Sequence, residues 1–147
     1  MIITDIISLD RTQCAVECHS KKRILEVISE IAVKQNPELD QAEVLNALVN
    51  REKMGSTGIG NGIAIPHGRI NGIENIIAVI LTSEHGIDFD AIDNQQVDVF
   101  FALLVPNDAG NSHLESLSAI ARKLSNKDIV KAIRNAENKN QIVAALA

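Results

Sequence analysis

The stretches NIIAVILT at residues 75–82 and DVFFALLV at residues 98–105 decide the fold class. Both are nearly continuous runs of β-branched and other apolar residues, which is typical of strands buried on both faces of a sheet. The second run stops at Pro106, whose missing N–H removes a donor from a strand ladder. A further short strand is expected between them at Ile87–Phe89. We therefore predict a buried sheet at the centre of the molecule.

Two segments ahead of these strands have the sequence patterns of helices. Residues Thr12–Glu17 are expected to form a short strand, after which Ser20 caps a helix that ends near Pro37. Asp40 and Glu43 then form a capping-box pattern at the start of a second amphipathic helix. Two consecutive helices are therefore predicted ahead of the central strands.

Helices are also expected after the central strands. Apolar residues recur at helical spacing from about Ser112, and shorter helical segments follow at Ile129–Ile133 and Ile142–Leu146. The first of these helices has an apolar stripe of Leu114, Leu117, Ala121 and Leu124. This order predicts a single α/β domain over residues 1–147, with three α/β/α layers in which helices flank a small mixed β-sheet.

The composition limits the classes of function. The 147-residue chain has 14 Lys and Arg against 19 Asp and Glu, a net charge of −5, and only 2% aromatic residues. It lacks the basic surface and stacking side chains that nucleic-acid binding uses, so no nucleic-acid partner is expected. The N-terminus has no cationic export signal, and no apolar run is long enough to span a membrane. Because Cys14 and Cys18 match neither a zinc motif nor a disulfide framework, we predict a reduced, cytoplasmic chain without cofactors.

The segment REKMGSTGIGNGIAIPHGR, residues 51–69, has an unusual density of glycine. It holds Gly55, Gly58, Gly60, Gly62 and Gly68, out of 8 glycines in the whole chain. A phosphate loop requires Lys and Ser or Thr where this chain has Asn61 and Gly62, and a dinucleotide fingerprint would need glycine at Ile63. Nucleotide binding is therefore disfavoured, and a flexible loop with glycines at its turns is the alternative interpretation.

His67 is the candidate nucleophile of this segment. It follows a short apolar run and stands between Pro66, which restrains the backbone, and Gly68, which leaves open space. Neutral imidazole is a competent nucleophile near neutral pH and can carry a phosphoryl group transiently. The alternative interpretation is a hydrogen-bonded turn histidine.

The other histidines differ in their setting. His19 and His85 lie beside charged or turn residues and are expected on the surface. His113 is expected in the first turn of a helix that follows a buried strand, where α/β sheets commonly place their sites. A polar helix-start residue is the alternative interpretation of His113.

A phosphoryl group in transit needs hydrogen-bond donors and positive charge around its oxygens. The candidate donors are the side chains of Arg51, Arg69, Ser56 and Thr57 and the backbone N–H groups of the glycine loop, including Gly58 and Gly60. Each arginine alone is also typical of a solvated charge.

A cluster of acidic and amide residues lies between the central strands. Asp88, Asp90, Asp93 and Asn94 resemble half of a calcium loop but lack its glycine and terminal glutamate. We interpret them as turn residues and expect no metal. A metal-dependent hydrolase that uses His67, His113 and one of these aspartates is the alternative from another functional class.

The chain closely resembles the enzyme IIA domains of the mannitol/fructose class of the bacterial phosphoenolpyruvate phosphotransferase system, and most of all their nitrogen-regulatory branch. One matching motif is REKMGSTGIGNGIAIPHG, and another is FDAIDNQ-VD-FALLVP, whose gaps are filled here by Gln96, Val99 and Phe100. The helix start His113-Leu114-x-x-Leu117 is the third. The resemblance spans most of the chain from Ser20 to about Leu124.

The resemblance implies a phosphotransferase component that accepts a phosphoryl group on His67 from a histidine-phosphorylated carrier resembling HPr. It also implies that His113 is a second active-site histidine, which stabilises the phosphoryl group, and that Arg51 is the paired cation. Sugar-type relatives pass the group to a IIB domain, which is the alternative function. The nitrogen-regulatory branch instead signals by binding target proteins according to its phosphorylation state. An interaction module that does not use His67 is a further alternative.

Overall fold

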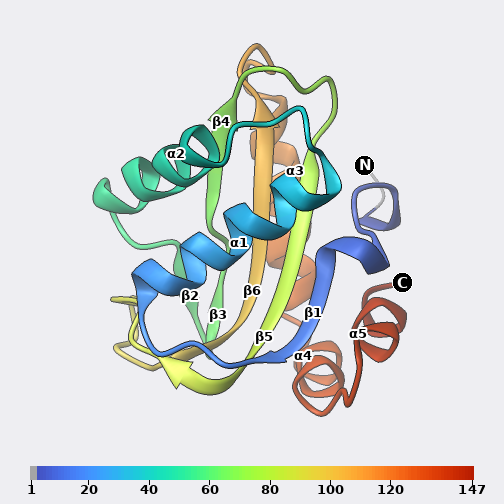
Figure 1. The fold of residues 1–147 in the computed structure, drawn as a ribbon. Helices are drawn as coiled ribbons and strands as arrows, with labels where there is room; N and C mark the ends of the chain where they lie inside the picture. Colours follow the sequence, from blue (N-terminus) through green and yellow to red (C-terminus); the bar gives the residue numbers. More distant parts are fainter. Residues whose placement is uncertain (1–2) are drawn as a thin grey trace.

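The computed structural model describes residues 3–147, with every side chain in that range except that of Ser112. Over these residues the chain forms a six-stranded mixed sheet with helices on both faces (Figure 1). The strands are β1 (Thr12–Val16), β2 (Gly58–Gly60), β3 (Ile63–Ala64), β4 (His67–Ile70), β5 (Ile77–Ile87) and β6 (Val97–Pro106). The helices are α1 (Lys21–Gln35), α2 (Gln41–Lys53), α3 (Ser112–Leu124), α4 (Lys127–Arg134) and α5 (Lys139–Leu146), with short 3-10 helices η1 (Ile3–Asp5) and η2 (Leu9–Arg11).

The two long strands form the middle of the sheet. Strands β5 and β6 are antiparallel, whereas β1 is parallel to β5, and β3 and β4 are both parallel to β6. The strand order is β1-β5-β6-β3-β2, with β4 also paired to β6. The predicted mixed sheet is thus confirmed. The separately predicted strand at Ile87–Phe89 is wrong, because β5 continues to Ile87 and Phe89 lies outside any strand.

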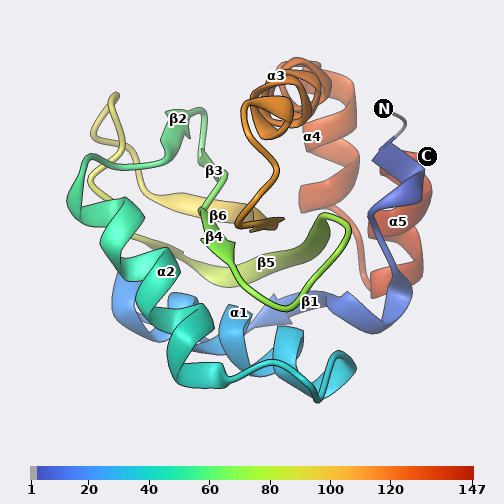
Figure 2. The ribbon, with the colours of Figure 1, turned by 90° about the horizontal axis from the view of Figure 1, so that it is seen from above.

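Alternating side chains of β5 and β6 divide the core into two apolar clusters, one on each face of the sheet. One cluster joins Val79, Leu81, Phe100 and Ala102 to residues of α1 and α2. The other joins Ala78, Ile80, Phe101 and Leu103 to residues of α3, α4 and α5. Figure 2 shows α1 and α2 on one side of the sheet and α3, α4 and α5 on the other. The predicted three-layer arrangement is confirmed.

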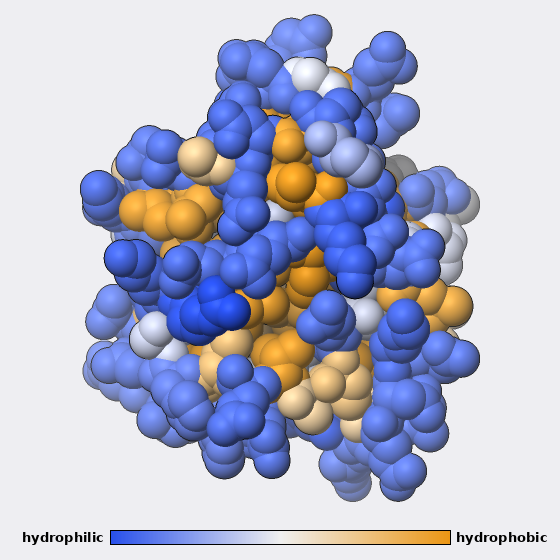
Figure 3. Space-filling model, in the orientation of Figure 1, coloured by the Kyte–Doolittle hydropathy of each residue, from blue (hydrophilic) through white to orange (hydrophobic). Residues whose placement is uncertain are grey.

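The helices are amphipathic, as a layer on a sheet requires. In α1 the buried residues Ile24, Leu25, Ile28 and Ile31 face the sheet. Hydrophilic side chains dominate the molecular face that α1 and α2 cover, and apolar atoms show mainly in gaps between them (Figure 3). Within residues 3–147, no helix combines the length and the apolarity that a membrane crossing needs.

The helix starts agree with the predicted caps, with one difference. The Ser20 hydroxyl accepts a hydrogen bond from the Arg23 N–H at 3.1 Å, and the Asp40 carboxylate accepts one from the Ala42 N–H at 3.0 Å. Glu43 does not complete the expected capping box, because its carboxylate accepts the N–H of Asn71 at 3.2 Å instead. Glu43 thereby links α2 to the segment that follows β4.

The interpretation of the glycine-rich segment as a flexible loop is wrong. Strands β2 and β3 form an antiparallel hairpin, and β4 pairs with β6 from His67 opposite Leu103 to Ile70 opposite Pro106. The hairpin turns at Asn61, where the backbone is left-handed with φ of 58°. The segment is therefore part of the sheet that positions His67.

The predicted apolar stripe of α3 is confirmed except at Leu114. Leu114 is 52% exposed, whereas Ser116, Ile120 and Leu124 are buried. These three residues recur at i, i+4 and i+8, which is one face of a helix. Leu117 and Ala121 pack against the same apolar cluster, so Leu114 is the one residue of the predicted stripe that lies outside the buried face.

Gly68 marks a close approach between β4 and α2. A Cβ atom at this position would lie 2.9 Å from Ala47 Cβ and 3.0 Å from the Ala47 carbonyl carbon. Because these atoms belong to a packed helix, Gly68→Ala is expected to push α2 away from β4 and to lower the free energy of unfolding by about 1–3 kcal/mol. Urea denaturation measures this loss. Equal unfolding midpoints for the variant and the parent chain would contradict the close contact.

Candidate functional site

His67 is held at the first position of β4. Its Nδ1 lies 2.9 Å from the Ile65 carbonyl oxygen, and the preceding Pro66 carbonyl accepts the N–H of Leu103 at 2.8 Å. The half-buried ring is thus fixed by two residues of its own segment and by the pairing with β6. Because a carbonyl oxygen only accepts, this contact places a hydrogen on Nδ1.

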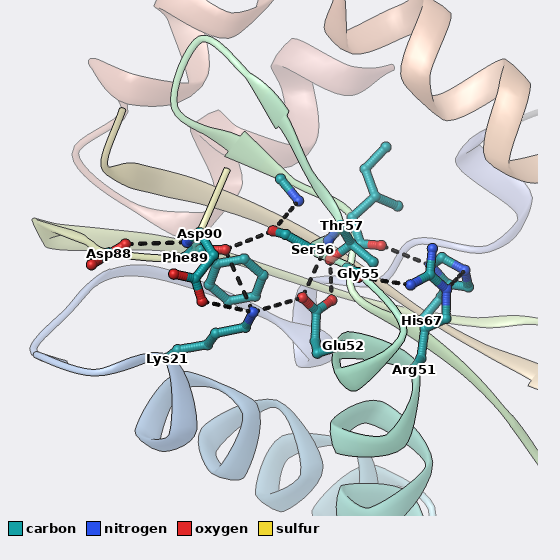
Figure 4. Close-up of polar contacts among 12 residues, drawn as sticks. Lys21, Arg51, Glu52, Gly55, Ser56, Thr57, His67, Asp88, Phe89 and Asp90 are labelled. Atoms are coloured by element: carbon teal, nitrogen blue, oxygen red, sulfur yellow. Dashed lines mark hydrogen bonds and ion pairs between the residues drawn. The ribbon is translucent and has the colours of Figure 1, made fainter. Parts of the chain in front are cut away.

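Arg51 faces the other nitrogen of the ring. It lies in the last turn of α2, where its Nε–H donates to His67 Nε2 at 3.2 Å and its Nη1 donates to the Gly55 carbonyl at 2.8 Å (Figure 4). Nε2 must therefore carry a lone pair, which agrees with a hydrogen on Nδ1. The lone pair and a guanidinium cation meet at the same point, as a site for an anionic electrophile requires.

The surroundings of the His67 ring favour its neutral form. Burial is the largest influence and lowers the pKa of His67, the Ile65 carbonyl raises it, and Arg51 lowers it further. Smaller contributions from Glu52 and His113 oppose each other in direction. Because the neutral imidazole is the nucleophilic form, the fold keeps His67 ready to react near neutral pH.

The lowered pKa of His67 leads to an expected pH dependence of stability. The unfolded chain, with a histidine pKa of about 6.5, binds this proton more readily than the folded chain. The stabilisation is therefore fully present above about pH 6.5 and decreases as the pH falls through the window between that value and the lower folded pKa. Urea unfolding across this pH window measures it. His67→Gln is expected to flatten that part of the profile, and an identical profile would contradict the lowered pKa.

Arg69 and His113 extend the site towards α3. Arg69 is two positions after His67 on β4, so both side chains emerge on the same face of the strand. Its guanidinium donates to the carbonyls of Asn107 at 3.2 Å and of Gly110, and its Nη2 lies 3.0 Å from His113 Nδ1. The structure thus brings Arg51, His67, Arg69 and His113 into one neighbourhood, although they belong to α2, β4 and α3.

Sequence comparison assigns the chain to a family. Residues 5–147 match the family described as "Phosphoenolpyruvate-dependent sugar phosphotransferase system, EIIA 2". The chain belongs to this family. It is therefore a component of the phosphotransferase system, as the sequence predicted.

Three relatives show where this EIIA chain stands within the family. It is 46% identical over 141 residues to the nitrogen regulatory protein of Escherichia coli K12, which covers 95% of this chain and 86% of that protein. The crystal structure of nitrogen regulatory protein IIA-Ntr from Neisseria meningitidis matches with a TM-score of 0.90 at 36% identity, over 99% of each chain. The fructose-specific EIIA component of Haloferax volcanii is 34% identical over 128 residues, covering 87% of this chain and 83% of that protein.

The remaining predicted phosphoryl ligands of this EIIA chain lie in the β2–β3 hairpin or directly before it. The Ser56 hydroxyl donates to the Phe89 carbonyl at 2.6 Å and accepts the Gly58 N–H at 3.0 Å, while the Thr57 hydroxyl donates to Glu52. Gly60 is paired with Ile63 in the β2–β3 hairpin. The two hydroxyls and the Gly58 N–H thus make hydrogen bonds within the chain, and the assignment of Ser56, Thr57, Gly58 and Gly60 to the phosphoryl oxygens stays a prediction.

The acidic cluster consists of turn residues, which confirms its interpretation. The Asp88 carboxylate accepts the N–H of Asp90 at 3.1 Å. The Asp93 carboxylate accepts the N–H groups of Asn61 and Gln95, at 3.0 and 3.1 Å, and these bonds lower its pKa. Within residues 3–147 no three His, Cys, Asp or Glu side chains are grouped to hold a metal. The metal-dependent hydrolase alternative therefore has no geometric basis among the residues described.

The remaining histidines of the EIIA chain lie on the surface, as expected. The side chain of His19 is 68% exposed and lies 3.7 Å from the Glu17 carboxylate. Its ring stacks on that of His85, with centroids 5.3 Å apart. Neither ring belongs to the neighbourhood of His67.

Proposed function

We propose that the chain is a histidine phosphocarrier of the nitrogen-type phosphotransferase system, which accepts a phosphoryl group on Nε2 of His67 from an HPr-like protein. The observation that carries the proposal is the tautomer of the His67 ring and the cation that faces it. Nδ1 is bonded to the Ile65 carbonyl, and the lone pair on Nε2 faces Arg51. Membership of the EIIA family supports the same chemistry. In this proposal residues 1–147 act as one IIA-like domain, which works in the cytoplasm.

The proposed transfer is a displacement at phosphorus. The Nε2 lone pair of His67 forms a bond to the phosphorus of the donor phosphohistidine, and the P–N bond to the donor ring breaks with its electron pair. The His67 ring gains positive charge as the bond forms. The Ile65 carbonyl, 2.9 Å from Nδ1, stabilises that charge. Because one P–N bond replaces another, the transfer is readily reversible.

Arg51, Arg69 and His113 are the groups we assign to the phosphoryl oxygens. Arg51 already contacts Nε2, where the phosphoryl group would attach, and Arg69 joins β4 to His113 at the start of α3. A transferring phosphoryl group spreads negative charge over its three equatorial oxygens, so preorganised cations are the main protein contribution to such a reaction.

The outlet of the phosphoryl group distinguishes two branches of the family. We favour regulation of target proteins, because this chain is 46% identical to a protein named nitrogen regulatory protein and 34% identical to a fructose-specific component. Phosphorylation adds a charge of about −1.5 to −2 at one place, which a partner surface can distinguish electrostatically. Transfer to a IIB domain for sugar uptake is the second candidate, supported by the family description.

Heteronuclear NMR tests the proposed function. The ¹⁵N-labelled chain is incubated with phosphoenolpyruvate, the first enzyme of the system and an HPr-like carrier. We expect a phosphorus resonance coupled to Nε2 of His67 and an acid-labile mass increase. A phosphoryl group on any other residue, or none after full turnover of the donor, would refute the assignment. Adding a purified IIB domain then separates the branches, since rapid loss of label to IIB indicates a sugar-type outlet.

A further inference from the structure

Glu52 is a buried carboxylate to which the proposed function gives no role. It follows Arg51 on α2, and its side chain is only 4% exposed. Glu52 Oε1 accepts the Thr57 N–H at 3.2 Å, and Oε2 accepts the Thr57 hydroxyl (Figure 4). Both carboxylate oxygens thus bind Thr57, and Glu52 fixes the end of the turn at residues 54–57.

Thr57 connects this carboxylate to the His67 ring. The Thr57 carbonyl accepts the Ile65 N–H at 3.0 Å, and the Ile65 carbonyl lies 2.9 Å from His67 Nδ1. The position of Thr57 therefore helps to set the position of the Ile65 carbonyl. That carbonyl selects the tautomer of His67 and so leaves the lone pair on Nε2.

The same turn also connects Glu52 to the guanidinium of Arg51. The Gly55 N–H donates to the Glu52 carbonyl at 3.1 Å, and the Gly55 carbonyl accepts Arg51 Nη1 at 2.8 Å. Arg51 in turn donates to His67 Nε2. The contacts form a circuit from the Glu52 carboxylate through Thr57, Ile65, His67 and Arg51 to Gly55 and the main-chain carbonyl of Glu52, which restrains both nitrogens of the ring.

Lys21 compensates the negative charge of the buried Glu52 carboxylate. Its Nζ lies 3.1 Å from Glu52 Oε1, 3.6 Å from Asp90 Oδ2 and 4.6 Å from the centre of the Phe89 ring. A buried ion pair adds little net stability compared with an apolar pair of similar volume, so stability alone is a weak reason for this one. Its position beside the site suggests a role in positioning.

We propose that Glu52 is a positioning residue for phosphoryl transfer: its carboxylate holds Thr57, which sets the tautomer of His67 and ends the 54–57 turn whose Gly55 carbonyl directs Arg51. The expected effect on the transfer rate rests on the proposed function. The expected effect on the ring does not, because the circuit exists in the unphosphorylated chain.

The test combines a spectroscopic and a kinetic measurement on the full chain. Long-range ¹H–¹⁵N spectra report which nitrogen of His67 carries the hydrogen. We expect Nδ1–H in the parent chain and a mixture with Nε2–H in Glu52→Gln and Thr57→Val. Thr57→Val removes the hydroxyl donor, and Glu52→Gln replaces with an NH2 group one of the two oxygens that accept from Thr57. The single-turnover rate of phosphoryl transfer from the phosphorylated HPr-like carrier is expected to fall about 10-fold in both variants. Thr57→Ser keeps a hydroxyl at position 57, so its His67 tautomer and its transfer rate are both expected to match those of the parent chain.

Matched controls decide between positioning and general destabilisation. Glu30→Gln makes the same chemical change in an exposed pair, where Glu30 lies 3.0 Å from Arg23, and should alter neither readout. A parent-like tautomer together with a transfer rate within about twofold of the parent chain, in both Glu52→Gln and Thr57→Val, would overturn the proposal. If the parent chain itself takes no phosphoryl group, the proposed function fails, and the tautomer comparison alone decides the role of Glu52.

Discussion

Replacement of His67 by alanine is expected to reduce phosphoryl acceptance by at least about 10³-fold, because Nε2 is the atom that forms the bond to phosphorus. The neighbouring hydroxyls offer no substitute. Ser56 donates to the Phe89 carbonyl, and Thr57 donates to Glu52. Acid-labile label per chain, measured by intact mass after incubation with the phosphorylated carrier, gives the remaining acceptance.

The fold is expected to survive this change. His67 is half-buried and pairs with β6 through its backbone, which alanine retains. The loss of the imidazole should lower the free energy of unfolding by about 1–3 kcal/mol, which is within the usual range for a single substitution. A folded but unlabelled variant is therefore the expected result.

His85→Ala is the matched control for this experiment. It also removes an imidazole, but from an exposed position outside the site. Parent-like labelling of His85→Ala, together with the loss in His67→Ala, assigns the acceptor to one residue. Undiminished label in His67→Ala would eliminate His67, and mapping of that label would show whether His113 accepts the group.

The parts of the fold that sequence reasoning found are those with strong local signals. The long apolar runs of β5 and β6 can satisfy their burial only at the centre of a sheet, and Ser20 and Asp40 bond to N–H groups within their own first turns. Such features depend on neighbours in the sequence. They are therefore visible without knowledge of the tertiary contacts.

The strands of the glycine-rich segment were not predicted, because they have no local signal. Strands β2, β3 and β4 have 3, 2 and 4 residues, too few for an alternating pattern to emerge, and glycine is depleted in strands generally. Their pairing depends on the edge that β6 presents to β3 and β4. That edge is a tertiary property, so composition left a flexible loop open as an alternative.

The candidate site also contains residues that the sequence alone identified and others that only the structure shows. The residues alone nominated His67 as a nucleophile, whereas the pairing with Arg51, 16 positions away, came from the resemblance to a family and is visible as a contact only in the structure. Glu52 was missed entirely. A glutamate in the last turn of a helix is typical of a solvated charge, and its burial becomes apparent only when α1 brings Lys21 against it.

Arg51→Ala is expected to slow phosphoryl transfer about 10²–10³-fold, the usual cost of removing one preorganised donor from a site of developing negative charge. Two effects of Arg51 oppose each other. Its hydrogen bond to Nε2, at 3.2 Å, occupies the lone pair and must break before attack, which costs about 1 kcal/mol. The charge that Arg51 offers to the phosphoryl oxygens is worth about 2.7–4 kcal/mol, so the loss of rate dominates.

Arg51→Lys distinguishes charge from geometry at this position. The guanidinium donates to His67 Nε2 and to the Gly55 carbonyl at the same time, which a single ammonium group cannot reproduce with the same planar fork. We therefore expect Arg51→Lys to transfer faster than Arg51→Ala and slower than the parent chain. Single-turnover rates with the phosphorylated carrier measure this order, and Arg23→Lys, in an exposed pair with Glu30, is the matched control. A rate for Arg51→Ala at or above that of the parent chain would mean that Arg51 mainly restrains the lone pair and contributes nothing to the phosphoryl oxygens.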